Sequence, residues 1–124
     1  MINQFLLYTG AALTAIWGIA HLFPTKSVVK GFGDISLDNR HIITMEWITE
    51  GVCLIFIGVS TAVVTWIDRS SSVSILVYWI CFAELNVLSL VSLFTGFKIN
   101  FLPFKLCPFI FTGSSVLIIL GYLI

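Results

Sequence analysis

Four long apolar segments, separated by short polar connections, dominate the hydrophobic pattern of the chain. We place them near residues 4–23, 42–67, 72–96 and 101–123. Each segment has about the 20 residues that an α-helix needs to cross a hydrocarbon core roughly 30 Å thick. The pattern therefore predicts an all-α fold, an integral membrane four-helix bundle.

The connections leave no room for a separate soluble domain. Residues 68–71 and 96–100 form short polar turns, and only the loop predicted at 24–41 is longer. We therefore expect residues 1–124 to form a single transmembrane domain.

The long loop carries signals for the end of one helix and the start of the next. Pro24 cannot continue the first helix, because proline lacks a backbone N–H. Asp34, Ser36 and Asp38 are candidate N-caps for the second helix, because their side-chain oxygens can accept from the unpaired N–H groups of a first turn. The second helix is accordingly predicted to be the longest.

Composition supports the membrane assignment and excludes one class of partner. The chain is 59% hydrophobic and 10% charged, with a mean hydropathy of +1.10, whereas charged residues make up about 25% of an average soluble domain. Its six basic and six acidic residues give no formal net charge. Nucleic-acid binding needs a basic face, so we expect the lipid bilayer and no nucleic acid as a partner.

The basic residues are concentrated around two of the three connections. Only Arg69 marks the second connection, and the basic residues near the other two are Lys26, Lys30, Arg40, Lys98 and Lys105. Short loops rich in lysine and arginine remain on the cytoplasmic side of a membrane. We therefore predict that loops 24–41 and 97–100 are cytoplasmic and that both termini lie outside.

Three glutamates lie inside the apolar segments. A carboxylate at helix-centre depth costs about 2.5 to 3.5 kcal/mol on insertion scales, so it normally faces a bundle interior, a cavity or a partner. Glu46 and Glu50 are four residues apart and share one helix face, whereas Glu84 lies in the third segment. Two like charges on one face repel, and either a proton or a bound cation would offset that repulsion.

Counted from the cytoplasmic end of each helix, the polar residues form a column of increasing depth. His21 lies in the last turn of the first helix, Glu46 in the first membrane turn of the second and Glu50 one turn deeper. Glu84 and Asn86 lie near the middle of the third helix. We predict that all five line a ligand-binding cavity capped by the long loop. The plainer alternatives are that His21 anchors at the interface and that Glu46 extends to the headgroups.

Other conspicuous residues have structural interpretations. The aromatic side chains, Trp17 and Trp47 among them, are expected in interfacial belts or in bundle packing. Gly10, Thr14 and Gly18 recur every four positions on the first helix and would permit close helix approach.

The three cysteines, Cys53, Cys81 and Cys107, are odd in number, and each lies within a predicted span. This pattern supports neither a disulfide framework nor a cysteine-based zinc motif. We expect these side chains to act as small apolar fillers.

Several short motifs together resemble those of the DoxX-like small bacterial membrane proteins. They are His21-x-x-Pro24 at the end of the first helix, Glu50-Gly51 in the second, a short basic second turn and Asn86 in the third. The resemblance implies a location in the bacterial cytoplasmic (inner) membrane and an association with quinone-linked or thiol-linked redox systems, often as an accessory subunit. The lack of a paired-cysteine motif and the additional Glu46 and Glu84 depart from that pattern and count against thiol exchange.

Three functions remain open from the sequence. The first is a redox-associated or ligand-binding accessory subunit, with a quinone-like ligand near His21, Glu50, Glu84 and Asn86. The second is a membrane metalloenzyme in which His21 and the three glutamates bind a metal, although the Glu-x-x-His pairs of soluble di-iron bundles are absent. The third is a proton-coupled transporter built from an oligomer of this chain.

A purely structural subunit of a larger membrane complex is a fourth possibility. The sequence assigns no catalytic residue, because no serine has an evident base and orienting partner at readable spacing. We therefore expect a non-catalytic role, within a larger membrane complex or a homo-oligomer.

Overall fold

The computed structural model describes residues 2–124, which form five α-helices and one short 3₁₀ helix and contain no strand. In chain order the elements are α1 (Gln4–Leu22), α2 (Thr25–Lys30), α3 (Leu37–Asp68), α4 (Ser72–Phe94), η1 (Gly96–Lys98) and α5 (Leu102–Leu123). Four spans are long and apolar enough to cross a membrane. They are α1, α3, α5 and the continuous stretch made of α4 and η1. The predicted all-α, four-helix membrane fold is confirmed, and it defines a multi-pass membrane protein.

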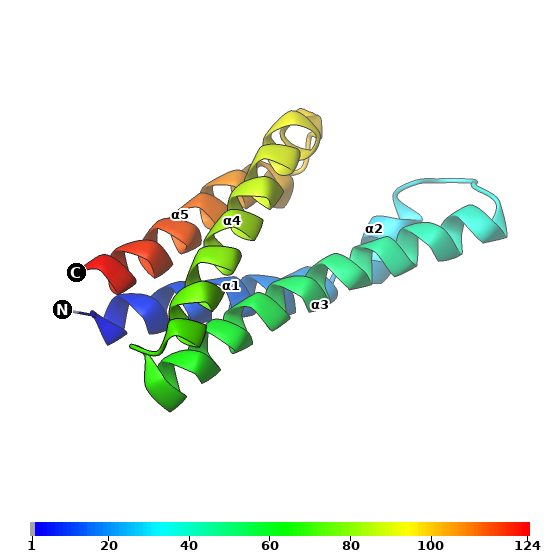
Figure 1. The fold of residues 1–124 in the computed structure, drawn as a ribbon. Helices are drawn as coiled ribbons and strands as arrows, with labels where there is room; N and C mark the ends of the chain where they lie inside the picture. The colour runs from blue at the N-terminus through cyan, green and yellow to red at the C-terminus, as the bar shows by residue number, and fades with distance from the viewer. Residues whose placement is uncertain (1) are drawn as a thin grey trace.

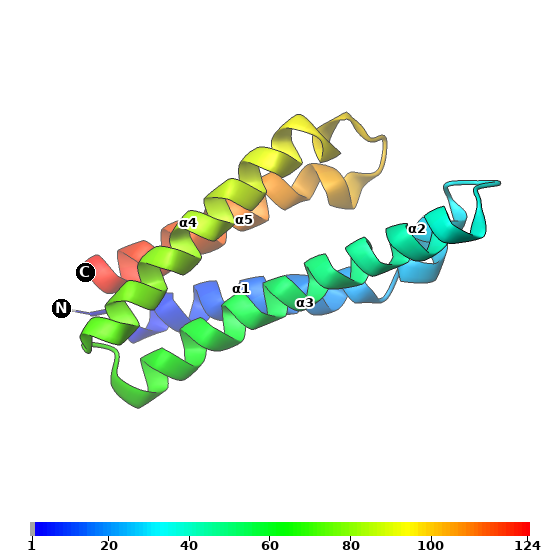
Figure 2. The same ribbon diagram turned by 45° about the vertical axis from the view of Figure 1, so that its right-hand side comes forward.

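The helices are arranged as two pairs that meet at one end and diverge at the other (Figures 1 and 2). α1 lies beside α3, α4 lies beside α5, and α1 also packs against α5. Both termini and the α3–α4 turn lie at the narrow end, where the Asn3 backbone N–H donates to Gly121 O at 2.7 Å. The connection that contains α2 and the one that contains η1 lie at the open end.

Small residues allow α1 to approach its two neighbours closely. A Cβ atom added at Gly10 would lie 3.0 Å from Ser114 O on α5, and one added at Gly18 would lie 2.7 Å from Gly51 O on α3. Thr14, between these glycines, is buried and donates its hydroxyl to Gly10 O. The predicted close-packing face of the first helix is therefore present, with one end on α5 and the other on α3.

Side chains from all four long helices fill the core toward the narrow end. The largest fully buried hydrophobic side chains are those of Leu7, Leu54, Tyr78, Leu85, Phe111 and Ile118. Near the α3–α4 turn, the hydroxyls of Thr65 and Tyr78 lie 3.0 Å apart. Since the Thr65 hydroxyl donates to Thr61 O, the Tyr78 hydroxyl is the donor in this pair. This bond links α3 to α4 where the helices are closest.

We expect Tyr78→Phe to lower the free energy of unfolding by about 0.5–1.5 kcal/mol, the net contribution of one intramolecular hydrogen bond. The ring keeps its packing, and only the bond to Thr65 is lost. Unfolding in a denaturing detergent, followed by circular dichroism, measures the change. The matched control is Tyr8→Phe, because Tyr8 is exposed. Equal stability of the two variants would contradict this role for the α3–α4 bond.

The segment predicted as a loop over residues 24–41 is more ordered than expected. It contains α2, and α3 begins within it at Leu37, because Ser36 is the N-cap and its hydroxyl accepts from Asn39 N at 3.2 Å. Val29 is buried and holds α2 beside α3. A six-residue helix has too few residues to show a helical hydrophobic period, so its formation depends on this tertiary contact.

Candidate ligand-binding site

The most constrained polar side chain at the open end is His21, in the last turn of α1. Its ring stacks on Trp47 of α3, with centroids 3.9 Å apart and an interplanar angle of 16°. Trp47 Nε1 donates to His21 O at 2.8 Å. Carbonyl groups in the last turn of a helix have no partner within the helix, so this bond satisfies one of them and fixes α1 against α3.

Glu50 approaches the same histidine. His21 Nε2 lies 3.5 Å from Glu50 Oε2, which makes an ion pair when the imidazole is protonated. Trp47 and Glu50 are three residues apart and therefore occupy neighbouring positions on α3. The His21 side chain is 6% exposed and that of Glu50 37% exposed, so the carboxylate also reaches open space.

Beside His21 is a mostly apolar cavity of about 190 Å³ between α1 and α5. Its lining residues are Trp17, Ala20, His21, Pro24, Trp47, Phe101, Pro103, Phe104 and Cys107. Phe104 meets Trp47 edge to face, with centroids 5.5 Å apart. Ala20, Phe101 and Pro103 are exposed, so the cavity opens on the outer surface of the bundle.

Two buried nitrogen atoms on residues that line this cavity make no hydrogen bond, although Glu50 Oε2 lies 3.5 Å from one of them, His21 Nε2. Among residues 2–124, three buried side-chain polar atoms have no such partner, and these are Trp17 Nε1, His21 Nε2 and Ser114 Oγ. Two of the three therefore belong to this one cavity. A buried donor left unpaired costs about 1–3 kcal/mol, so two at one place are a reason to look for a ligand there.

A second hollow, of about 580 Å³, lies between α3 and α4 where the helix pairs diverge. From α3 it is lined by Glu46, Thr49, Glu50 and Cys53, and from α4 by Leu88, Val91, Ser92 and Thr95. Trp47, Phe104 and Cys107 line both hollows and form the wall between them. We call this second hollow the α3–α4 cleft.

The structure brings together part of the predicted column. His21 and Glu50 are in contact, and Glu46 lines the α3–α4 cleft as an exposed side chain. Glu84 is exposed on α4 and lines neither the cavity beside His21 nor the α3–α4 cleft. Asn86 donates to Phe82 O of its own helix at 2.7 Å. Glu84 and Asn86 are two residues apart, and such positions do not face the same side of a helix.

The predicted metal ligands are not gathered at one place in the structure. Within the part of the chain that the structure describes, no three histidine, cysteine or acidic side chains are grouped closely enough to hold a metal ion. Of the four predicted ligands, only His21 and Glu50 form a contacting pair. The free cysteines are divided between the core, where Cys81 and Cys107 are buried, and the cleft, where Cys53 is half-buried.

From the sequence, Trp17 and Trp47 are expected in interfacial belts or in bundle packing, and no role is predicted for Phe104. One signal was available: Trp17 and His21 are four residues apart, so they share the face of α1 that lines the cavity. No pattern in the sequence indicated that Phe104 of α5 would complete the wall, because that contact joins distant segments.

Comparisons with protein families, curated proteins and solved structures find no match for this chain.

Proposed function

We propose that this protein binds a quinone-like molecule, with its ring in the cavity beside His21, as a redox-associated accessory subunit of the bacterial inner membrane. The observation that carries the proposal is that two residues lining one apolar cavity, Trp17 and His21, each have a buried ring nitrogen, Trp17 Nε1 and His21 Nε2, that makes no hydrogen bond. The resemblance to DoxX-like proteins agrees with this proposal, as do the four apolar helices.

The size of the cavity favours a single ring. An engineered cavity of about 150 Å³ lined by apolar side chains binds benzene. The cavity beside His21, at about 190 Å³, has room for one substituted ring. Its mouth at Ala20, Phe101 and Pro103 lies on an apolar outer face, which would let a hydrocarbon tail extend into the bilayer.

The two nitrogens also suit the chemistry of a quinone. The Trp17 indole can only donate, and a quinone carbonyl can only accept. His21 Nε2 donates or accepts according to its protonation, so it can pair with the carbonyl of a quinone or with the hydroxyl of a quinol. Glu50 Oε2 lies 3.5 Å from His21 Nε2 and can hold the imidazole in place beside the cavity. The cavity lies at the open end, and the basic residues near that end predict that it faces the cytoplasm.

A matched pair of probes separates hydrogen bonding from apolar binding. Duroquinone and durene carry the same four methyl groups on one ring, but only duroquinone has carbonyl oxygens. We expect Trp17→Phe to weaken duroquinone binding about tenfold, because one buried hydrogen bond is lost, and to leave durene binding within about twofold. Isothermal titration calorimetry on the detergent-solubilised protein measures both affinities.

The control variant is Trp66→Phe, because Trp66 is 79% exposed near the other end of α3. It should bind both probes as the unaltered protein does. Equal affinity of the unaltered protein for duroquinone and durene would contradict a role for the two nitrogens. If neither duroquinone nor durene bound, the cavity would be rejected as the site.

A further inference from the structure

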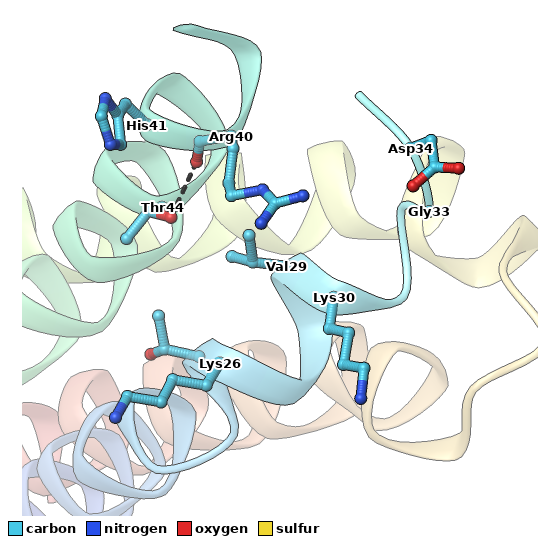
Figure 3. A pocket seen from close by; sticks show the side chains of 9 residues that line it. Lys26, Val29, Lys30, Gly33, Asp34, Arg40, His41 and Thr44 are labelled. Atoms are coloured by element: carbon cyan, nitrogen blue, oxygen red, sulfur yellow. Dashed lines mark hydrogen bonds between the residues drawn. The ribbon is translucent and has the colours of Figure 1, made fainter. Parts of the chain in front are cut away.

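A third hollow, of about 650 Å³, lies between α2 and the first turns of α3, outside the site described above (Figure 3). Its lining residues are Thr25, Lys26, Val29, Lys30, Gly33, Asp34, Arg40, His41 and Thr44. Figure 3 shows Arg40 reaching from α3 toward α2, whereas the side chains of Lys26 and Lys30 extend from α2 away from Arg40. We call this hollow the basic pocket.

The charges of the basic pocket are not neutralised within the protein. Lys26, Lys30 and Arg40 supply three positive charges against one negative charge from Asp34. Across residues 2–124 the only ion pair is that between His21 and Glu50, so Asp34 neutralises none of these cations. The pocket therefore attracts an anion.

The two threonine hydroxyls of the basic pocket are already engaged as donors. Thr25 donates to Leu22 O at 2.6 Å and Thr44 donates to Arg40 O at 2.7 Å. The bond from Thr44 is drawn in Figure 3. The side-chain donors that remain for an anion are Lys26, Lys30, Arg40 and His41, and three of these four are cations, which favours phosphate over a neutral ligand.

The depth of the basic pocket corresponds to the headgroup layer of a membrane. α3 has 32 residues, about 48 Å at 1.5 Å per residue, whereas a hydrocarbon core is about 30 Å thick. Since the other end of α3 is joined to α4 by a tight turn, the first turns of α3 project beyond the core. Around them the apolar side chains of Phe23, Phe32 and Leu37 are exposed.

We propose that the basic pocket binds the phosphate of an anionic phospholipid headgroup. Arg40 contacts the phosphate, and the exposed, flexible side chains of Lys26 and Lys30 turn toward it from α2. The exposed side chains of Phe23 and Phe32 lie along the upper part of the acyl chains. A soluble phosphate ester would use the same cations but would gain nothing from these apolar side chains. Basic pockets beside transmembrane helices recognise anionic lipids through the same combination of charges and depth.

Native mass spectrometry of the protein in detergent, with phosphatidylglycerol or phosphatidylcholine added, tests the proposal. We expect phosphatidylglycerol to bind at least tenfold more tightly. Each basic residue near an anionic surface contributes about 1 kcal/mol, or roughly fivefold, so Lys26→Gln/Lys30→Gln/Arg40→Gln should lose about a hundredfold. The matched control is Lys98→Gln/Lys105→Gln, which removes charge at the same end of the bundle and should lose less than threefold.

A second variant acts in the opposite direction and does not depend on a loss of function. Asp34→Asn removes the only negative charge of the basic pocket and should tighten phosphatidylglycerol binding severalfold. Equal losses in the triple variant and in the control, or no effect of Asp34→Asn, would overturn the proposal. Competition by glycerol 3-phosphate at the affinity of the lipid would also overturn it, in favour of a soluble phosphate ester.

Discussion

One added methyl group at Gly58 is expected to loosen the packing of α1 against α3. A Cβ atom at this position would lie 2.5 Å from Ala11 O and 2.8 Å from Ala15 N, both of them backbone atoms. Backbone cannot rotate away as a long side chain can, so the two helices must move apart. Overpacking of this kind costs about 1–3 kcal/mol, and we expect Gly58→Ala to lower the free energy of unfolding by that amount.

The matched control for this prediction is Gly113→Ala. Gly113 also lies inside a long helix, α5, but an added Cβ there meets no heavy atom within 4 Å. Alanine is the better helix former, so this variant should be as stable as the unaltered protein or slightly more stable. Detergent-induced unfolding followed by circular dichroism compares the two. If Gly58→Ala were as stable as Gly113→Ala, α1 and α3 would not be held at the observed separation.

The four long helices were predictable because each rests on a local property of the sequence. An uninterrupted apolar run of spanning length needs no knowledge of tertiary contacts, and the predicted ends of α1 and α5 differ from the observed ends by at most one residue. The short helix α2 was not predicted, because it is stabilised by packing against α3. The divergence of the two helix pairs was not predicted either, since neither hydropathy nor charge specifies an angle between helices.

The candidate site was predictable only in part, for the same reason. Depth along each helix correctly placed His21 and Glu50 near each other, because both could be counted from one side of the membrane. Depth does not specify which way a side chain points around the helix axis. The predicted column therefore also included Glu84 and Asn86, although the structure places neither beside His21. The stacked ring of Trp47 is what orients His21, and such a contact between segments is not encoded in a spacing.

We expect His21→Ala to weaken duroquinone binding by roughly thirtyfold and Glu50→Gln to weaken it by roughly fivefold. In the proposed site the larger effect follows because His21 lines the cavity and would bond to the ring oxygen, whereas Glu50, 3.5 Å from His21 Nε2, would act by holding the imidazole in place. The bond from Trp47 Nε1 is made to the backbone carbonyl of residue 21, so it survives the alanine substitution and keeps α1 on α3. Isothermal titration calorimetry provides both affinities.

The double variant distinguishes action through His21 from direct contact with the ligand. If Glu50 is a positioning residue, Glu50→Gln should have almost no effect once His21 is alanine, and the coupling between the two changes should be about 1 kcal/mol. Strictly additive losses would mean that Glu50 meets the ligand independently, from the α3–α4 cleft that it also lines. Durene binding provides the internal reference: since durene has no oxygen, it should be insensitive to Glu50→Gln. A fivefold loss for durene as well would show that the substitution deforms the cavity and that the effect on duroquinone is not a matter of hydrogen bonding.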